Sequence, residues 1–159
     1  MRSFFSAIAI TLSVAACVTH ADETNDLQPA RDLQVFLKTA RKADSFEQVL
    51  PLLPEETRDD YQRQESVWDK DAIRSAVKES SLFGDSADLF ARTPYEKGLG
   101  RYRSMADKIR KYVSTEIDGD EATVHVETRV NGEWNPATVR MVREGAHWKF
   151  DDLKIDLEW

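Results

Sequence analysis

The fold of this chain is decided by residues Lys111–Trp159, KYVSTEIDGDEATVHVETRVNGEWNPATVRMVREGAHWKFDDLKIDLEW. Within this stretch, apolar and polar residues alternate in four runs that begin near Tyr112, Ala122, Ala137 and Trp148. A period of two places every second side chain on the same face of a β-strand. The stretch therefore predicts four strands, each with one face turned towards a core. The residues expected to face the core are Val113, Thr115 and Ile117 in the first run, Ala122, Val124, Val126 and Val130 in the second, and Ala137, Val139 and Met141 in the third.

Turn signals separate the four runs. They are Asp118-Gly119-Asp120, Asn131-Gly132 and Glu144-Gly145-Ala146. Asn-Gly is a preferred dipeptide of two-residue hairpins because both positions take positive φ. Trp134 and Pro136, which follow closely, nevertheless predict a longer connection at this point.

The fourth run changes phase. Trp148 and Phe150 share one parity, whereas the later apolar residues share the other: Leu153, Ile155, Leu157 and Trp159. A regular strand cannot keep both sets on its core side. One extra residue near Asp151-Asp152, a β-bulge, would reconcile them and would also bend the sheet. The sequence thus predicts a strongly curved antiparallel meander.

Helices are predicted before the strands. From Pro29 onward, apolar residues recur at helical spacing on one side of an amphipathic helix: Ala30, Leu33, Phe36, Leu37 and Ala40. Ser45-Phe46-Glu47-Gln48 has the form of a capping box that would begin a short helix, and another helix is expected from Pro54-Glu55-Glu56. The expected class is α+β, with N-terminal helices packed on a C-terminal curved antiparallel four-stranded sheet, in a single domain at residues 29–159.

The middle of the chain is less regular. Val67–Phe83 predicts a longer helix, with Trp68, Ile73 and Val77 on its apolar side and Gly84 at its end. Residues 87–91 would add one more turn. Thr93-Pro94 and the pair Gly98 and Gly100 predict an irregular stretch before the sheet.

The first 21 residues predict export. Arg2 precedes an apolar segment that is too short to span a bilayer, as in a signal peptide. Cleavage is expected either after Ala21 or before Cys17, because Val14-Ala15-Ala16-Cys17 resembles a bacterial lipobox. The protein would then be periplasmic, or attached to the outer membrane through lipidated Cys17, with residues 22–28 as a tether. Cys17 is the only cysteine, so no disulfide is expected.

The charge of the chain limits its partners. The formal net charge is −7, which argues against nucleic acid because that partner needs a concentrated basic surface. The one basic run, Lys108-Ile109-Arg110-Lys111, is too short to change this prediction. A small molecule or a protein is the expected partner, and a basic protein would suit the charge.

Few residues suggest chemistry. His125 lies on the polar face of the second run, His147 opens the fourth, and Asp151 and Asp152 lie at the expected bulge. These four are weak catalytic candidates, since each is also explained as a surface residue or, for the aspartates, as support for the bulge. The sequence has neither the spacing typical of a metal site nor a nucleophile or phosphate-binding motif, so neither metal nor cofactor is expected. Trp134, in a polar hairpin, is the candidate contact residue.

Two segments resemble the small exported bacterial proteins of the nuclear transport factor two-like and cystatin-like group. They are Ile117–Val124, similar to that group's acidic-Gly-acidic hairpin, and Glu144–Asp151, similar to its closing Gly and Trp-Lys strand; Leu33–Leu53 is similar to its first helix more loosely. The resemblance implies helices against a curved sheet whose concave side can hold a small molecule. This chain departs from the group at Tyr61–Leu99, where the sequence predicts helix and loop and many members of the group have an early pair of strands.

Three functions follow as hypotheses. The first is a non-enzymatic cell-envelope module that binds a small ligand or a protein. The second is an isomerase-type or dehydratase-type enzyme with a carboxylate or histidine in the cavity of the sheet. The third, suggested by the acidic charge and small size, is a periplasmic inhibitor or immunity protein. The lining of the cavity distinguishes the first two: a closed pocket with His125, Asp151 or Asp152 directed inward and a tyrosine nearby favours the enzyme, and an apolar or filled interior favours binding or scaffolding.

Overall fold

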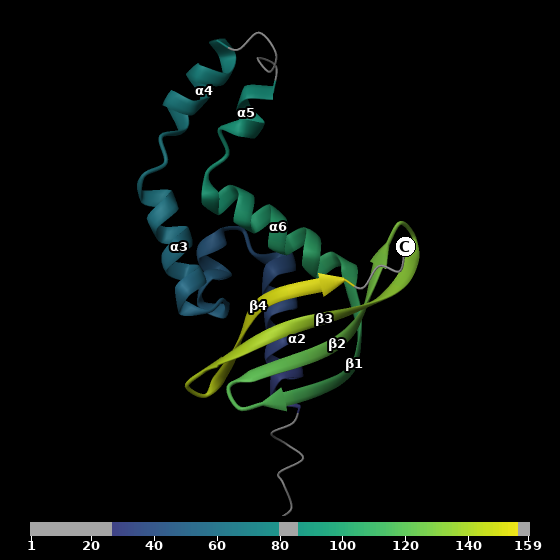
Figure 1. Ribbon diagram of the computed structural model, residues 1–159. Coiled ribbons are helices and arrows are strands. Elements are labelled where there is room, and N and C mark those ends of the chain that lie inside the picture. The colour runs from purple at the N-terminus through teal and green to yellow at the C-terminus, as the bar shows by residue number, and fades with distance from the viewer. Residues whose placement is uncertain (1–26, 80–85, 156–159) are drawn as a thin grey trace, which may run out of the picture.

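The computed structural model of the protein describes residues 27–79 and 86–155, and its helices precede its strands as predicted (Figure 1). The helical elements are α2 (Gln28–Lys42), η1 (Phe46–Gln48), η2 (Leu50–Leu52), α3 (Glu55–Ser66), α4 (Lys70–Glu79), α5 (Ala87–Phe90) and α6 (Pro94–Lys108). The strands are β1 (Ile109–Asp118), β2 (Glu121–Val130), β3 (Glu133–Glu144) and β4 (His147–Ile155). The export signal at residues 1–21 with Cys17, most of the tether, and Gly84, Leu157 and Trp159 lie outside the described residues.

The four strands form one antiparallel meander in the order β1-β2-β3-β4, and the ribbon bends along its length (Figure 1). The class predicted from the sequence is thereby confirmed. The longer connection predicted after Val130 is wrong, because β3 begins at Glu133 and Trp134 pairs with Arg129. Asn131 and Gly132 both have positive φ, 53° and 89°, so they form the tight turn by themselves.

The predicted bulge is present in β4. Arg140 of β3 pairs with Asp152 and Met141 pairs with Phe150, which leaves Asp151 as the extra residue. Because of this insertion, Trp148 and Phe150 are buried and Leu153 and Ile155 still pack against the same core. The change of phase in the sequence is thus absorbed by one residue.

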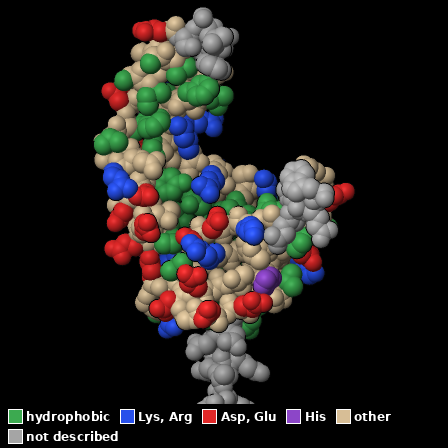
Figure 2. Space-filling view, in the orientation of Figure 1, with side chains coloured by type: hydrophobic (Ala, Val, Ile, Leu, Met, Phe, Trp, Pro, Cys, Tyr) green, Lys and Arg blue, Asp and Glu red, His purple; other side chains and the backbone are tan. Residues whose placement is uncertain are grey.

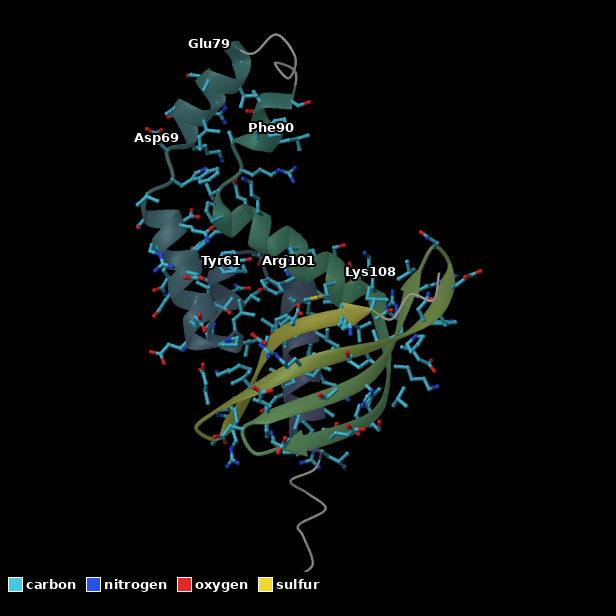
Figure 3. All side chains as sticks on the ribbon, viewed as in Figure 1. Tyr61, Asp69, Glu79, Phe90, Arg101 and Lys108 are labelled. Atoms are coloured by element: carbon cyan, nitrogen blue, oxygen red, sulfur yellow. The ribbon has the colours of Figure 1, made fainter. Side chains whose placement is uncertain are left out.

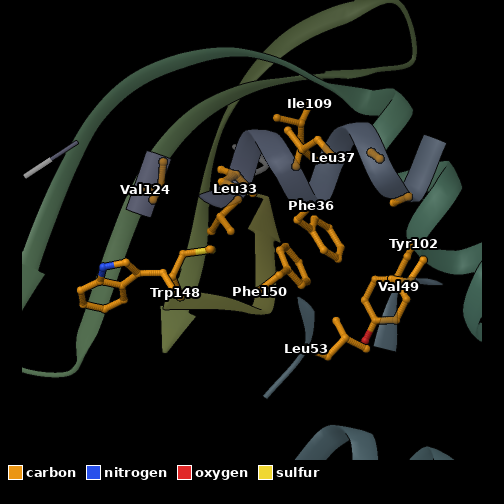
Figure 4. Packing of buried hydrophobic residues seen from close by; sticks show 14 of the residues in the cluster. Leu33, Phe36, Leu37, Val49, Leu53, Tyr102, Ile109, Val124, Trp148 and Phe150 are labelled. Carbon is orange, nitrogen blue, oxygen red and sulfur yellow. The ribbon is translucent and has the colours of Figure 1, made fainter. Parts of the chain in front are cut away.

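α2 covers one face of the sheet, and its predicted apolar stripe is buried: Ala30, Leu33, Phe36, Leu37 and Ala40. Phe36 stacks on Phe150 of β4 with ring centroids 4.2 Å apart, and Tyr102 of α6 meets both rings edge-on (Figure 4). At the end of the helix nearer the β3–β4 turn, the Asp32 carboxylate accepts a hydrogen bond of 2.8 Å from the backbone N–H of Trp148. Aromatic rings therefore occupy the space between α2, α6 and β4.

The capping box predicted at Ser45 is wrong. The Ser45 side chain makes no capping hydrogen bond, and the short helix expected here forms as two 3₁₀ helices, η1 and η2. The Gln48 side chain instead accepts a hydrogen bond of 3.1 Å from the backbone N–H of Asp44. Phe46 and Val49 are buried, so the segment packs against the core without the predicted cap.

The irregular stretch predicted from Thr93 to Gly100 is also wrong, because α6 runs through it. Thr93 caps this helix in a complete capping box with Glu96, and Pro94 occupies its first turn. Gly98 is a buried position of α6 where the helix passes the ring of Phe46: a Cβ at this residue would lie 2.8 Å from the nearest ring carbon. The glycine reflects close packing here and not a break in the helix.

α4 and α5 project from the rest of the molecule as an arm (Figure 1). The predicted apolar side of α4 is not buried; Ile73 and Val77 are half-exposed, and no residue of α4 is buried. Trp68 holds the base of the arm, since its indole N–H donates to the Ala91 carbonyl at 3.3 Å and the Lys97 ammonium lies 4.3 Å above its ring. Within residues 27–79 and 86–155, no helix combines the length and the apolar character needed to cross a membrane.

Candidate functional site

The sheet has a second face that the helices leave uncovered, and Figure 2 looks onto it. Strand alternation puts His125 and Asp152 on this face. His125 is half-buried, and its Nε2 lies 3.3 Å from Oε1 of Glu116 on β1, without the geometry of a hydrogen bond. His125 pairs with Thr138, whereas Asp152 pairs with Arg140, so β3 lies between them and about 10 Å separates their strands.

Asp151 supports the bulge. Its side chain, which is 18% exposed, accepts a hydrogen bond of 2.5 Å from Nε of Arg140. This hydrogen bond, with the negative charge of Asp151, raises the pKa of the Arg140 guanidinium above its ordinary value. The carboxylate is thus engaged in holding the extra residue in place.

His147 is exposed at the start of β4, opposite Glu144. The four catalytic candidates therefore do not converge on one cavity. The tyrosines that could assist them lie on the other face, where Tyr61, Tyr95 and Tyr102 pack around Phe46.

Trp134 is 54% exposed on the β2–β3 hairpin, where the Arg129 guanidinium lies 6.0 Å from its ring centroid. This position makes the indole accessible to a partner, in a geometry typical of a weak cation–π contact.

A groove opens between α2 and β1, at a place that the sequence did not indicate. Tyr112 pairs with Val126 but Ser114 pairs with His125, so Val113 is an extra residue in β1. Tyr112 consequently shares the core face of Val126, and Val113 is 54% exposed, contrary to prediction. Thr115 and Ile117 have the predicted facing, opposite Val124 and Ala122, but Ile117 is still 39% exposed.

The groove has a volume of about 230 Å³. Its floor is apolar, because Leu33 and Leu37 of α2, Ile109 of β1 and Val126 of β2 line it. Ala30, Gln34, Leu37 and Arg41 follow one another along the helix side of the groove. From Ala30 to Arg41 the helix rises about 16 Å at 1.5 Å per residue. The shape therefore suits an elongated ligand.

One end of the groove is basic. Arg41 lies there and donates hydrogen bonds to the carbonyls of Ala106 and Ile109, with the Asp107 carboxylate 3.7 Å away. Arg110 and Lys111 also line this end. Lys111 pairs with Glu127 at 3.1 Å. The sequence feature that could have predicted this basic end is the run at 108–111. Its charged residues follow neither a helical nor a strand period, so the sequence does not show on which side of the fold they gather.

The described residues contain no group of three or more His, Cys, Asp or Glu side chains placed to hold a metal ion. Comparisons with protein-family models, curated proteins and solved structures found no match for this chain. The resemblance to the nuclear transport factor two-like and cystatin-like group stays a prediction, and any function has to be inferred from the site itself.

Proposed function

We propose that this chain is an exported cell-envelope protein that binds a small, elongated and largely apolar ligand in the groove between α2 and β1, without catalysing a reaction. The export part rests on the signal-peptide pattern of residues 1–21. The binding part rests on one observation: a groove of about 230 Å³ remains between α2 and β1, over apolar side chains that belong to the core, whereas aromatic rings pack the space between α2, α6 and β4.

The size of the groove limits its ligand. Pockets for drug-sized molecules usually enclose about 300–1,000 Å³, and this groove has about 230 Å³. A single narrow chain fits such a space better than a fused ring system. Tyr112, which is 37% exposed at the rim, supplies an aromatic edge that a ligand would cover.

Binding without catalysis accounts best for the candidate residues. His125 and Asp152 lie on the opposite face of the sheet from the groove, and Asp151 is committed to Arg140. A general base must come within hydrogen-bond reach of its substrate. A ligand in the groove would have the full thickness of the sheet between it and the side chains of His125 and Asp152.

Titration of the purified protein with a neutral, rod-shaped fluorescent probe of apolar sites, 1,6-diphenyl-1,3,5-hexatriene, tests the proposal. We expect saturable binding that Gln34→Trp weakens about tenfold or more, a loss of at least about 1.4 kcal/mol, because Gln34 lines the groove and an indole there would occupy it. Val35→Trp is the matched control, since Val35 is the next residue of α2, is 53% exposed and does not line the groove.

Circular dichroism would establish that both variants are folded. Equal affinity of the two variants for the probe, or the absence of saturable binding by the unaltered protein, would count against the groove as a binding site.

A further inference from the structure

A second hollow, of about 590 Å³, adjoins the basic end of the groove. It lies where α6 ends and β1 begins, beside the turn of the β2–β3 hairpin, and Figure 3 shows Lys108 at this end of α6. Four cationic side chains line it: Arg103 and Lys108 of α6, Arg110 of β1 and Arg129 of β2. Asp107 is the single carboxylate in this lining. The hollow is therefore locally basic in a chain whose formal net charge is −7.

The hydrogen bonds and ion pairs of these four side chains leave their positive charge available to a ligand. Arg103 donates to the Ala43 carbonyl and Arg129 to the Gly132 carbonyl, so both arginines are positioned without being neutralised by an acid. Among the described residues, neither Lys108 nor Arg110 has a carboxylate oxygen within 4 Å, and both side chains are exposed. Asp107 offsets little of this charge, since it faces Arg41 at 3.7 Å.

The end of α6 would by itself repel an anion, because the last carbonyls of a helix carry partial negative charge. Arg41 counters this effect, since its guanidinium binds the carbonyls of Ala106 and Ile109 at that end. Lys108 stands in the last turn of the same helix. The local field at the hollow is thus set by the four cations and not by the helix end.

Arg110 joins the hollow to the groove because it lines both. Ile109 pairs with Thr128 and Lys111 with Glu127, so Arg110 is an extra residue of β1. A bulge redirects the side chain that it carries. An apolar floor that leads to a cluster of arginines is complementary to a molecule with an apolar tail and an anionic head.

We propose that the ligand is a single-chain amphiphile with a carboxylate or phosphate head, whose tail lies in the groove and whose head binds Arg110 and Arg129 in the adjoining hollow. This inference rests on the proposed function and adds the chemical class of the ligand. The helix side of the groove, about 16 Å long, fits a medium-length acyl chain.

Isothermal titration calorimetry with monomeric decanoate tests the inference in the purified protein. We expect Arg110→Gln combined with Arg129→Gln to weaken decanoate binding about tenfold, the loss of roughly one charge-assisted hydrogen bond. The affinity of the unaltered protein should fall as salt is added. Decanol, which has the same tail without the charge, should bind the unaltered protein about tenfold more weakly.

Arg31→Gln combined with Lys38→Gln is the matched control, because both residues are exposed on α2 and line neither the groove nor the hollow. It removes the same charge and should leave the affinity for decanoate unchanged. Decanoate binding that Gln34→Trp abolishes but the Arg110/Arg129 variant leaves intact would overturn the inference and leave the groove as a binding site.

Two further outcomes would also overturn the inference. Absence of decanoate binding would overturn it, and together with absence of probe binding would remove the proposed function as well. Cosedimentation with phosphatidylglycerol vesicles in the absence of binding to monomeric decanoate would instead assign the cations to a membrane surface.

Discussion

Gly98 and Gly100 lie two residues apart in α6 and have opposite surroundings. A Cβ on Gly98 would come within 2.8 Å and 2.9 Å of two ring carbons of Phe46 and 3.0 Å of Tyr61, whereas a Cβ on Gly100 would meet nothing within 4 Å. Phe46 cannot move aside easily, since its ring is buried and contacts Tyr95 and Tyr102. One glycine is required by packing and the other is not.

Gly98→Ala should therefore destabilise the protein by about 1–3 kcal/mol, the usual cost of overpacking a core. Gly100→Ala should stabilise it by about 0.5–1 kcal/mol, because alanine restricts the unfolded chain and favours the helix. Urea denaturation of both variants beside the unaltered protein measures the two values. A neutral or stabilising Gly98→Ala would mean that α6 does not pass so close to Phe46.

At the scale of elements, the arm of α4 and α5 differs from the rest of the fold. Hydrophobic side chains gather on its surface in Figure 2, and Leu89 is 57% exposed. Its ion pairs, Arg74 with Asp88 and Lys70 with Glu96, are exposed, and exposed pairs contribute only about 0–1 kcal/mol each. α2, by contrast, buries a full stripe against the sheet.

Backbone amides of α4 should consequently exchange with deuterium much faster than those of α2, since local opening of α4 exposes little apolar surface. Hydrogen exchange followed by mass spectrometry measures both helices in one experiment, and β2 provides the slow reference because its core-facing residues are buried. Protection of α4 equal to that of α2 would show that another surface covers the arm in solution.

At the scale of the whole molecule, the core depends on a phenol that must stay neutral. Tyr102 is 3% exposed, and burial, with smaller effects from Tyr61 and Asp151, raises its pKa above the ordinary value of 10.0. The folded protein thus holds this proton more tightly than the unfolded chain. The stabilisation is fully present below the unfolded pKa and is lost as pH rises from there towards the folded pKa.

Above about pH 10, the free energy of unfolding should fall by up to about 1.4 kcal/mol per pH unit from this residue. Tyr102→Phe should flatten that decline, because phenylalanine has no proton to lose. Tyr112→Phe, which removes one phenol at an exposed position, is the matched control. Urea midpoints measured across this pH range give the slopes, and parallel curves for all three proteins would contradict the role given to Tyr102.

Predictability from the sequence also varied with scale. The bulge at Asp151 and the stripe of α2 were predicted because each follows from a period within one segment. α6 was missed because Gly98 weakens a helical pattern locally, and only its neighbour Phe46, 52 positions earlier in the chain, explains the residue. His125 was placed on a polar face correctly, yet a strand pattern does not tell which faces a helix will cover.

Local chemistry in the sequence determined the order of the elements, the number of strands, the turns at Gly119 and Gly145 and the inward faces of β2 and β3, since these depend on backbone preferences and periods within a few residues. Only the tertiary structure decided that a groove remains between α2 and β1. It also decided that Arg103, Arg110 and Arg129 meet at one hollow. Those outcomes depend on how elements distant in sequence pack against a shared core, and no single segment encodes that packing.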